Sequence, residues 1–168
     1  LVNIFPNPGI DHTDSFFAKY DTEGKGRRYI GIFANSSPSY KTTQFRVWSA
    51  LLAASKIIPG VSDDERDSYH TLLGYFNSLK DLGHARTLFN DDVPKHLEDI
   101  ASQLGLDPVN KRKIQEPIEL TSDVESGEIP DLMKRLTIKL PDAVDVCLAS
   151  NMISVGLDIP RLSLMTIL

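Results

Sequence analysis

The sequence predicts an α/β domain built on an open parallel sheet with flanking helices. Short apolar runs alternate with longer segments of helical periodicity, and this alternation is typical of repeated strand-helix-strand units. The expected strands lie near residues 71–76, 117–121, 144–149 and 163–168. Because helical segments connect successive strands, we expect the strands to run parallel.

Residues 1–60 are expected to form an N-terminal extension that packs on this domain. The runs 15–20 and 28–33, separated by the Gly-containing segment 21–26, predict a β-hairpin. Apolar residues at helical spacing predict a helix over 42–57, which Pro59 and Gly60 would end. Trp48 on this helix is interpreted as a core residue and not as a platform for stacking bases.

Residues 61–168 are expected to form the α/β lobe itself, with residues 61–69 as a polar linker. Ser78 and Asp81 have the spacing of an N-cap and its partner, so a helix is expected to begin there. Pro94 is expected to open another helix that ends at Gly105. A further helix is expected near Ile129, because Pro130 is tolerated only in a first turn.

Polar residues follow three of the expected strands where each strand ends. In a parallel sheet these ends share one edge, and binding sites form outside it. The residues expected at this edge are Asn77, Ser78, Thr121, Ser122, Ser150 and Asn151. Two simpler interpretations stay open: Ser78 would only cap its own helix, and Thr121 and Ser122 would be ordinary turn residues.

Composition limits the possible functions. The formal net charge of −5 argues against holding nucleic acid by overall charge, although local basic runs such as Lys111–Lys113 remain candidates. The single cysteine, Cys147, lies in an expected buried strand, which suits a reducing cytoplasm. No apolar run approaches the length of a membrane span, so no membrane partner is expected. The chain begins with Leu1, which suggests a fragment of a longer protein.

Catalytic and metal-binding patterns were not found. Gly24 and Lys25 do not form a phosphate-binding loop, and no apolar strand ends in the Asp-Glu pair that would bind magnesium. The four histidines share no ligand spacing with Cys147, so no metal site is expected. A third possibility is a small-molecule α/β enzyme, but the sequence shows no acid, base or nucleophile that would converge on one site.

The segment Leu148–Pro160 contains Ser150, Asn151 and the sequence Gly-Leu-Asp-Ile-Pro, and it resembles motif V of superfamily 2 helicases. Leu73–Leu79 resembles motif IV of the same family. The chain is therefore identified as similar to the second RecA-like lobe, within the P-loop NTPase superfamily. Residues 74–83 and 5–17 add to this resemblance. Taken with the two motifs, they are most similar to the large bacterial helicases of DISARM-type phage-defence systems.

This resemblance implies roles for the site residues. Asn77, Ser78, Thr121, Ser122, Ser150 and Asn151 would contact a nucleic-acid backbone, and Gly156 and Asp158 would couple that contact to a nucleotide. ATP and Mg²⁺ would bind between this lobe and a first RecA-like lobe that is absent here. The other implied partners are DNA and further defence-system proteins.

By itself the 168-residue chain is expected to be neither catalytic nor ligand-bound. An alternative stays open, in which the chain is a non-catalytic protein-interaction or regulatory module that keeps a helicase-lobe fold. The net charge of −5 and the long N-terminal extension favour that alternative.

Overall fold

The computed structural model describes residues 21, 23–24, 26–35, 39–150 and 159–168. The chain forms two compact units, Leu1–Phe33 and Ala34–Leu168. In the first unit, the Asp21 carboxylate accepts hydrogen bonds from the N–H groups of Glu23 (3.0 Å) and Gly24 (2.9 Å), which makes a turn.

The predicted hairpin is not confirmed. Its first run, 15–20, lies outside the described residues, and its second run, 28–33, contains no strand, so that part of the prediction is wrong. Tyr29 and Phe33 are 80% and 86% exposed, so these two aromatic side chains bury little apolar surface. A strand without a paired neighbour or a packed face is not stable in water.

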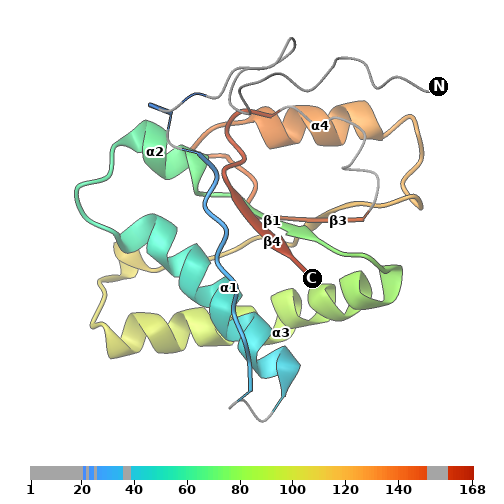
Figure 1. Cartoon of the computed structure of the whole chain (residues 1–168). Helices are drawn as coiled ribbons and strands as arrows, with labels where there is room; N and C mark the ends of the chain where they lie inside the picture. Colours follow the sequence, from blue (N-terminus) through green and yellow to red (C-terminus); the bar gives the residue numbers. More distant parts are fainter. Residues whose placement is uncertain (1–20, 22, 25, 36–38, 151–158) are drawn as a thin grey trace, which may run out of the picture. The chain divides into compact units, whose positions relative to one another are not determined.

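The second unit is built on a parallel sheet of four strands (Figure 1). The strands are β1 (Leu72–Tyr75), β2 (Ile118–Leu120), β3 (Val146–Ala149) and β4 (Leu164–Ile167), in the order β2-β3-β1-β4. All pairings are parallel, which confirms the predicted α/β sheet and its four strands. The narrower assignment to a RecA-like lobe stays a prediction.

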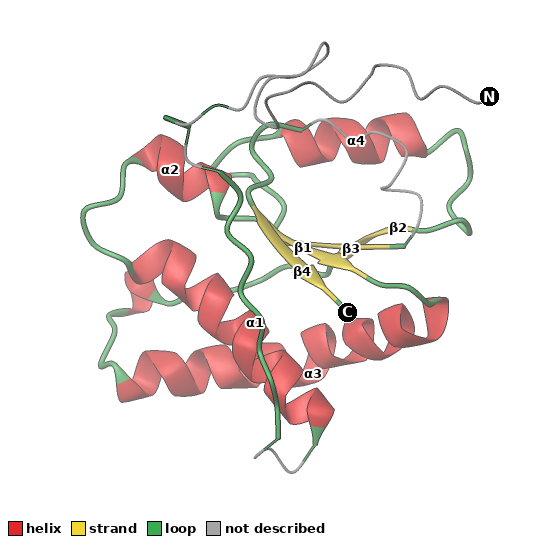
Figure 2. Cartoon of the chain, in the orientation of Figure 1, coloured by secondary structure: helices red, strands yellow, loops and turns green. Residues whose placement is uncertain are grey.

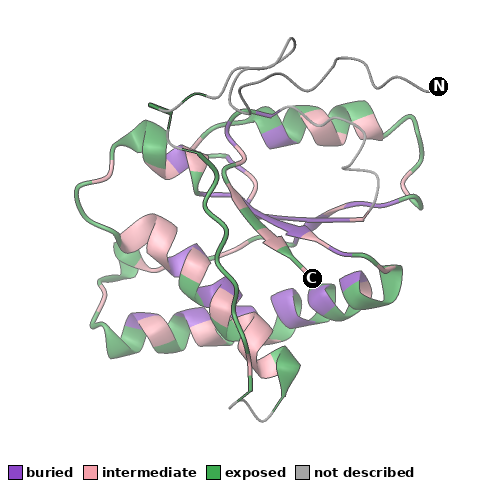
Figure 3. Cartoon of the chain, viewed as in Figure 1, coloured by how far each residue is buried: buried purple, intermediate pink, exposed green. Residues whose placement is uncertain are grey.

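Helices cover both faces of the sheet (Figure 2). On one face, α1 (Tyr40–Ile57) and α3 (Leu79–Gln103) pack against Leu72, Phe76, Val146 and Leu148. On the other, α4 (Ile129–Thr137) packs through Leu136 against Leu73, Cys147 and Ala149. Alternate residues of each strand point to opposite faces, so β1 and β3 supply both cores. All of β3 is buried, and β1 is buried as far as Tyr75, which is half-buried (Figure 3).

Helix α1 forms as predicted. The Ser39 hydroxyl accepts hydrogen bonds from the N–H groups of Lys41 and Thr42, which caps its first turn. Trp48 is 2% exposed and stacks on Phe89 of α3, with ring centroids 4.7 Å apart. Trp48 is therefore a core residue, as expected. We predicted this helix as part of the N-terminal extension, but α1 belongs to the same compact unit as the sheet.

Helix α3 corrects the prediction that Pro94 opens a separate helix. One helix of 25 residues runs through Pro94 and ends at Gln103, with Leu104 as its C-cap, followed by Gly105 with φ of 60°. An internal proline costs about 3 kcal/mol because it lacks an N–H group and its ring crowds the preceding turn. Leu88, Phe89, Val93 and Leu97 are buried on both sides of Pro94, and this burial offsets the cost.

Residues 61–69, predicted as a linker, contain the helix α2 (Asp63–Ser68), so that prediction is wrong. Ser62 and Glu65 form a reciprocal capping box at its start. A short 3-10 helix, η1 (Pro108–Asn110), follows α3, and α4 begins with Pro130 in its first turn as predicted. Among the described helices, none combines the length and apolar character that crossing a membrane requires.

Candidate functional site

The predicted polar residues that are described lie at one edge of the sheet, which we call the strand-end edge: Asn77, Ser78, Thr121, Ser122 and Ser150. Tyr75 and Leu120, the last residues of β1 and β2, both pair with Ala149 of β3. Backbone hydrogen bonds continue past the strands, from Phe76 N–H to Ala149 O (2.9 Å) and from Ser150 N–H to Leu120 O (3.1 Å). The segments that follow β1, β2 and β3 therefore leave the sheet at the same edge, as the sequence predicted.

Ser78 caps helix α3. Its hydroxyl accepts a hydrogen bond from Asp81 N–H (3.1 Å) and donates one to the Asp81 carboxylate (2.6 Å). Because its proton is engaged by Asp81, Ser78 donates to a phosphate only after releasing that carboxylate. Capping is therefore what the structure shows for Ser78, and a nucleic-acid contact stays a prediction.

Thr121 and Ser122 differ in accessibility. Thr121 is 3% exposed, and its hydroxyl accepts a hydrogen bond from Asp123 N–H (3.3 Å), so it shapes the turn after β2. Ser122, like Asn77, is exposed, and Ser150 is half-buried. The side chains best placed to meet a ligand at this edge are therefore Asn77, Ser122 and Ser150. The other predicted site residues, Asn151, Gly156 and Asp158, lie outside the described residues.

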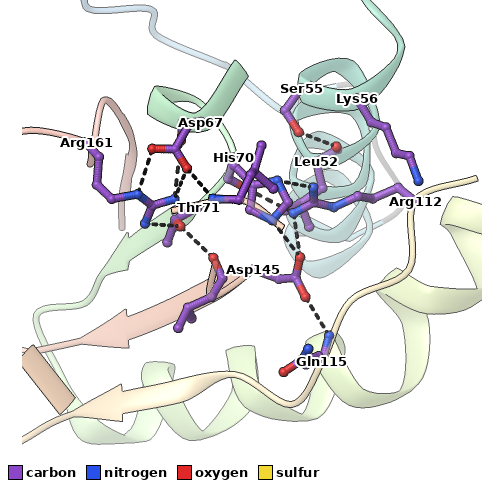
Figure 4. A network of polar contacts seen from close by, with 12 residues as sticks. Leu52, Ser55, Lys56, Asp67, His70, Thr71, Arg112, Gln115, Asp145 and Arg161 are labelled. Carbon is purple, nitrogen blue, oxygen red and sulfur yellow. Dashed lines mark hydrogen bonds and ion pairs between the residues drawn. The ribbon is translucent and has the colours of Figure 1, made fainter. Parts of the chain in front are cut away.

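At the opposite edge, where the strands begin, Arg161 and Asp67 form a buried ion pair (Figure 4). Arg161 Nε lies 3.1 Å from Asp67 Oδ2, and Nη2 lies 3.1 Å from Oδ1. Nη2 also donates to Asp67 O at 3.3 Å. Nη1 donates to Thr71 Oγ1 and to Leu136 O, both at 3.0 Å. All five N–H groups of the guanidinium are therefore used, and this one side chain joins α2, α4 and the start of β1.

A second buried network at the same edge joins Arg112, His70 and Asp145. Arg112 Nη2 donates to Asp145 Oδ1 at 2.7 Å, and Arg112 Nη1 lies 2.6 Å from His70 Nδ1. Because a guanidinium has no acceptor, Nδ1 must accept this hydrogen bond, so the His70 proton lies on Nε2. That nitrogen faces Asp145 Oδ1 at 3.2 Å. Asp145 Oδ2 accepts the N–H of Gln115 (2.8 Å), so the carboxylate is fully engaged.

Sequence reasoning missed both networks. Nothing in the local sequence marks Arg161 as a core residue, yet it is 6% exposed. Arg112 and His70 are separated by 42 positions, and Arg161 and Asp67 by 94. No local sequence motif predicts contacts between residues that are so far apart in the chain. The one usable signal was the alternation of strands and helices, which predicts that residues preceding neighbouring strands come together.

These networks lower the pKa values of two carboxyl groups. Burial alone would raise the pKa of Asp67, but hydrogen bonds from Arg161 and Leu140 outweigh it and hold the pKa below the ordinary 3.8. For Asp145, burial is likewise outweighed by the hydrogen bond from His70 and the charge of Arg112, so its pKa is also lowered. Each group is more readily ionised in the folded chain than in the unfolded chain.

We therefore expect the free energy of unfolding to fall in acid. Well above pH 3.8 both carboxylates are ionised in either state and their stabilisation is fully present. As the pH falls below 3.8 and then through the lowered pKa values, the unfolded state binds protons first and the stabilisation is lost. Urea denaturation between pH 6 and pH 2 measures this loss. Asp67→Asn should show a shallower decline, whereas Asp131→Asn, at an exposed ion pair, should keep the wild-type slope. Equal slopes in all three chains would contradict the assignment.

Metal and thiol chemistry find no support in the described part of the chain. It contains no cluster of three His, Cys, Asp or Glu side chains suited to a metal ion. Burial raises the pKa of the Cys147 thiol to about 12, so the group stays protonated and acts as a small apolar residue.

Comparison with known proteins gives one informative relative. The chain is 38% identical, over 174 aligned positions covering 99% of its length, to the DISARM protein DrmA of Bacillus paralicheniformis. The chain spans 15% of the length of that curated relative. No protein-family model matches the chain.

Proposed function

We propose that the chain is part of the motor region of a DISARM-type phage-defence protein, contributing a lobe similar to the second RecA-like lobe of superfamily 2 helicases. The 38% identity to the DISARM protein DrmA over nearly the whole chain carries the proposal. The parallel sheet and its polar strand-end edge support it, because ligands of open α/β sheets bind outside the carboxyl ends of the strands.

In this proposal the strand-end edge contacts the backbone of a DNA strand. Asn77 and Ser122 are exposed and Ser150 is half-buried, so their polar groups are available for phosphate oxygens. Lys80, exposed in the first turn of α3, adds a positive charge beside them. The carboxylate of Asp81 in the same turn repels a phosphate, so binding here depends on hydrogen bonds more than on charge.

ATP and Mg²⁺ belong, in this proposal, to the intact protein. The described residues include neither a phosphate-binding loop nor a metal cluster, so they do not supply a complete nucleotide site. Gly156 and Asp158 are the residues proposed to couple DNA contact to ATP bound between this lobe and a first lobe. No step of hydrolysis is assigned to this chain alone.

The test is the ATPase activity of the intact protein with and without single-stranded DNA. We expect Asp158→Ala to lower the DNA-stimulated rate at least about tenfold, because tenfold corresponds to only about 1.4 kcal/mol of transition-state stabilisation.

We expect Asn77→Ala to weaken DNA binding about fivefold, which corresponds to the net contribution of one hydrogen bond.

Asp131→Ala, an exposed carboxylate on α4, is the matched control and should leave both quantities unchanged. Unchanged stimulated turnover in Asp158→Ala would remove the motor assignment. It would favour the non-catalytic interaction module instead.

A further inference from the structure

A cavity of about 580 Å³ opens at the edge of the sheet where the strands begin, opposite the strand-end edge. The end of α1, α2, the segment after η1 and the segment before β3 contribute its walls. Residues that precede β1 and β3, His70 and Asp145, lie in its lining. Its size falls within the range of roughly 300–1,000 Å³ that small-molecule sites occupy.

The cavity lining carries an excess of positive charge. Its cations are Lys56, Arg66, Lys111, Arg112 and Lys113, and its one carboxylate is Asp145. The chain as a whole carries a net charge of −5, so this local excess is opposite in sign to the molecule around it. Cations that gather against the average charge of a protein are suited to an anionic ligand.

Three of the five cations have structural partners. Arg66 donates to the backbone carbonyls of Ser55, Lys56 and Ile58 and so completes the last turn of α1. Arg112 holds Asp145, and Lys56 Nζ donates to Lys111 O at 2.9 Å. Within the described ranges, the ammonium groups of Lys111 and Lys113 make neither a hydrogen bond nor an ion pair, so both remain available to a ligand.

One buried donor of the lining has no acceptor. Arg112 Nε is buried and has no acceptor among the described residues. Burial and the neighbouring charge of Arg112 lower the pKa of Lys56, and Asp145 only partly opposes this. An anion in the cavity would reduce the repulsion between these cations.

We propose that this cavity binds a small phosphate-bearing molecule, with Lys111 and Lys113 as the residues that contact the phosphate. Lysine ammonium groups bind phosphates as point charges. Pro108, Ile114 and Pro141 supply apolar wall for an organic part of the ligand. A volume of about 580 Å³ fits a small molecule and is too small for more than a short part of a nucleic-acid strand. The proposal does not rest on the motor function, because it concerns the opposite edge of the sheet.

The test is isothermal titration calorimetry on the intact protein at low salt, with pyrophosphate, AMP and a short single-stranded DNA as separate probes. We expect pyrophosphate or AMP to bind, and the double variant Lys111→Glu/Lys113→Glu to weaken that binding at least tenfold. The matched control Lys41→Glu/Arg46→Glu makes the same change in net charge at exposed positions of α1 outside the lining, and it should bind as the wild type does.

Two results would overturn the proposal. One is binding of pyrophosphate and AMP that the two double variants change equally, and the other is binding of DNA alone that depends on Lys111 and Lys113. Circular dichroism establishes that each variant is folded. If the double variant does not fold, the single variant Lys113→Gln, at an exposed position, replaces it in the titration. It should weaken the binding of pyrophosphate or AMP at least threefold. Absence of any binding by the wild-type protein also overturns the proposal.

Discussion

Arg161→Met is expected to lower the free energy of unfolding by about 3–5 kcal/mol, the usual cost of removing one partner of a buried ion pair. Asp67 is 4% exposed, and of the donors that the described residues supply to its carboxylate, the N–H of Leu140 alone would be left without Arg161. The change also leaves Thr71 Oγ1 and Leu136 O without the donor that each has now. Urea denaturation followed by far-UV circular dichroism measures the loss.

Two further variants separate the buried charge from general disruption. Asp67→Asn/Arg161→Met removes both charges, so it should be more stable than Arg161→Met alone. Lys134→Met removes an exposed partner of Asp131 and should cost about 0.5 kcal/mol or less. If the double variant were the less stable of the two, the unpaired carboxylate would not be the source of the instability.

Trp48→Ala is expected to cost about 3–5 kcal/mol, the range for deleting a large aromatic side chain from a core. Trp48 stacks on Phe89 and meets the edge of Phe76, with ring centroids 6.4 Å apart in the second pair. The indole therefore joins α1 to α3 and to the end of β1. Thermal unfolding of the variant should show a lowered midpoint.

Phe33→Ala is the control for this change, because Phe33 is an aromatic residue that is 86% exposed. It should alter stability by no more than about 0.5 kcal/mol. A Trp48→Ala variant of normal stability that binds single-stranded DNA poorly would instead identify Trp48 as a base-stacking residue.

The sheet could be predicted from sequence because its signals are local. The strands β1 and β3 are buried on both faces, so they appear as unbroken apolar runs between polar segments. Helix α2 was missed because its six residues, all charged or polar, show no apolar periodicity. Its signal was the spacing of Ser62 and Glu65, which matches a capping box.

The errors have a common physical origin in tertiary packing. Pro94 favours a helix start locally, yet burial of Val93 and Leu97 keeps α3 continuous. The run 28–33 has the composition of a strand, but composition does not supply a partner strand. The cavity could not be predicted, because Lys56 and Lys111 come together only when α1 and the segment after η1 are folded.

The length of the central strands has a consequence for how the two edges of the sheet influence one another. β1 and β3 have four residues each, and at about 3.3 Å per residue they separate the edges by about 13 Å. This exceeds the Debye length of about 8 Å at physiological ionic strength. Lys113 at one edge and Asn77 and Ser122 at the other are exposed to solvent, so salt largely screens an anion held by Lys111 and Lys113 from a phosphate at the strand-end edge. Communication between the two edges would have to be mechanical, through displacement of the strands themselves, and should therefore be insensitive to salt.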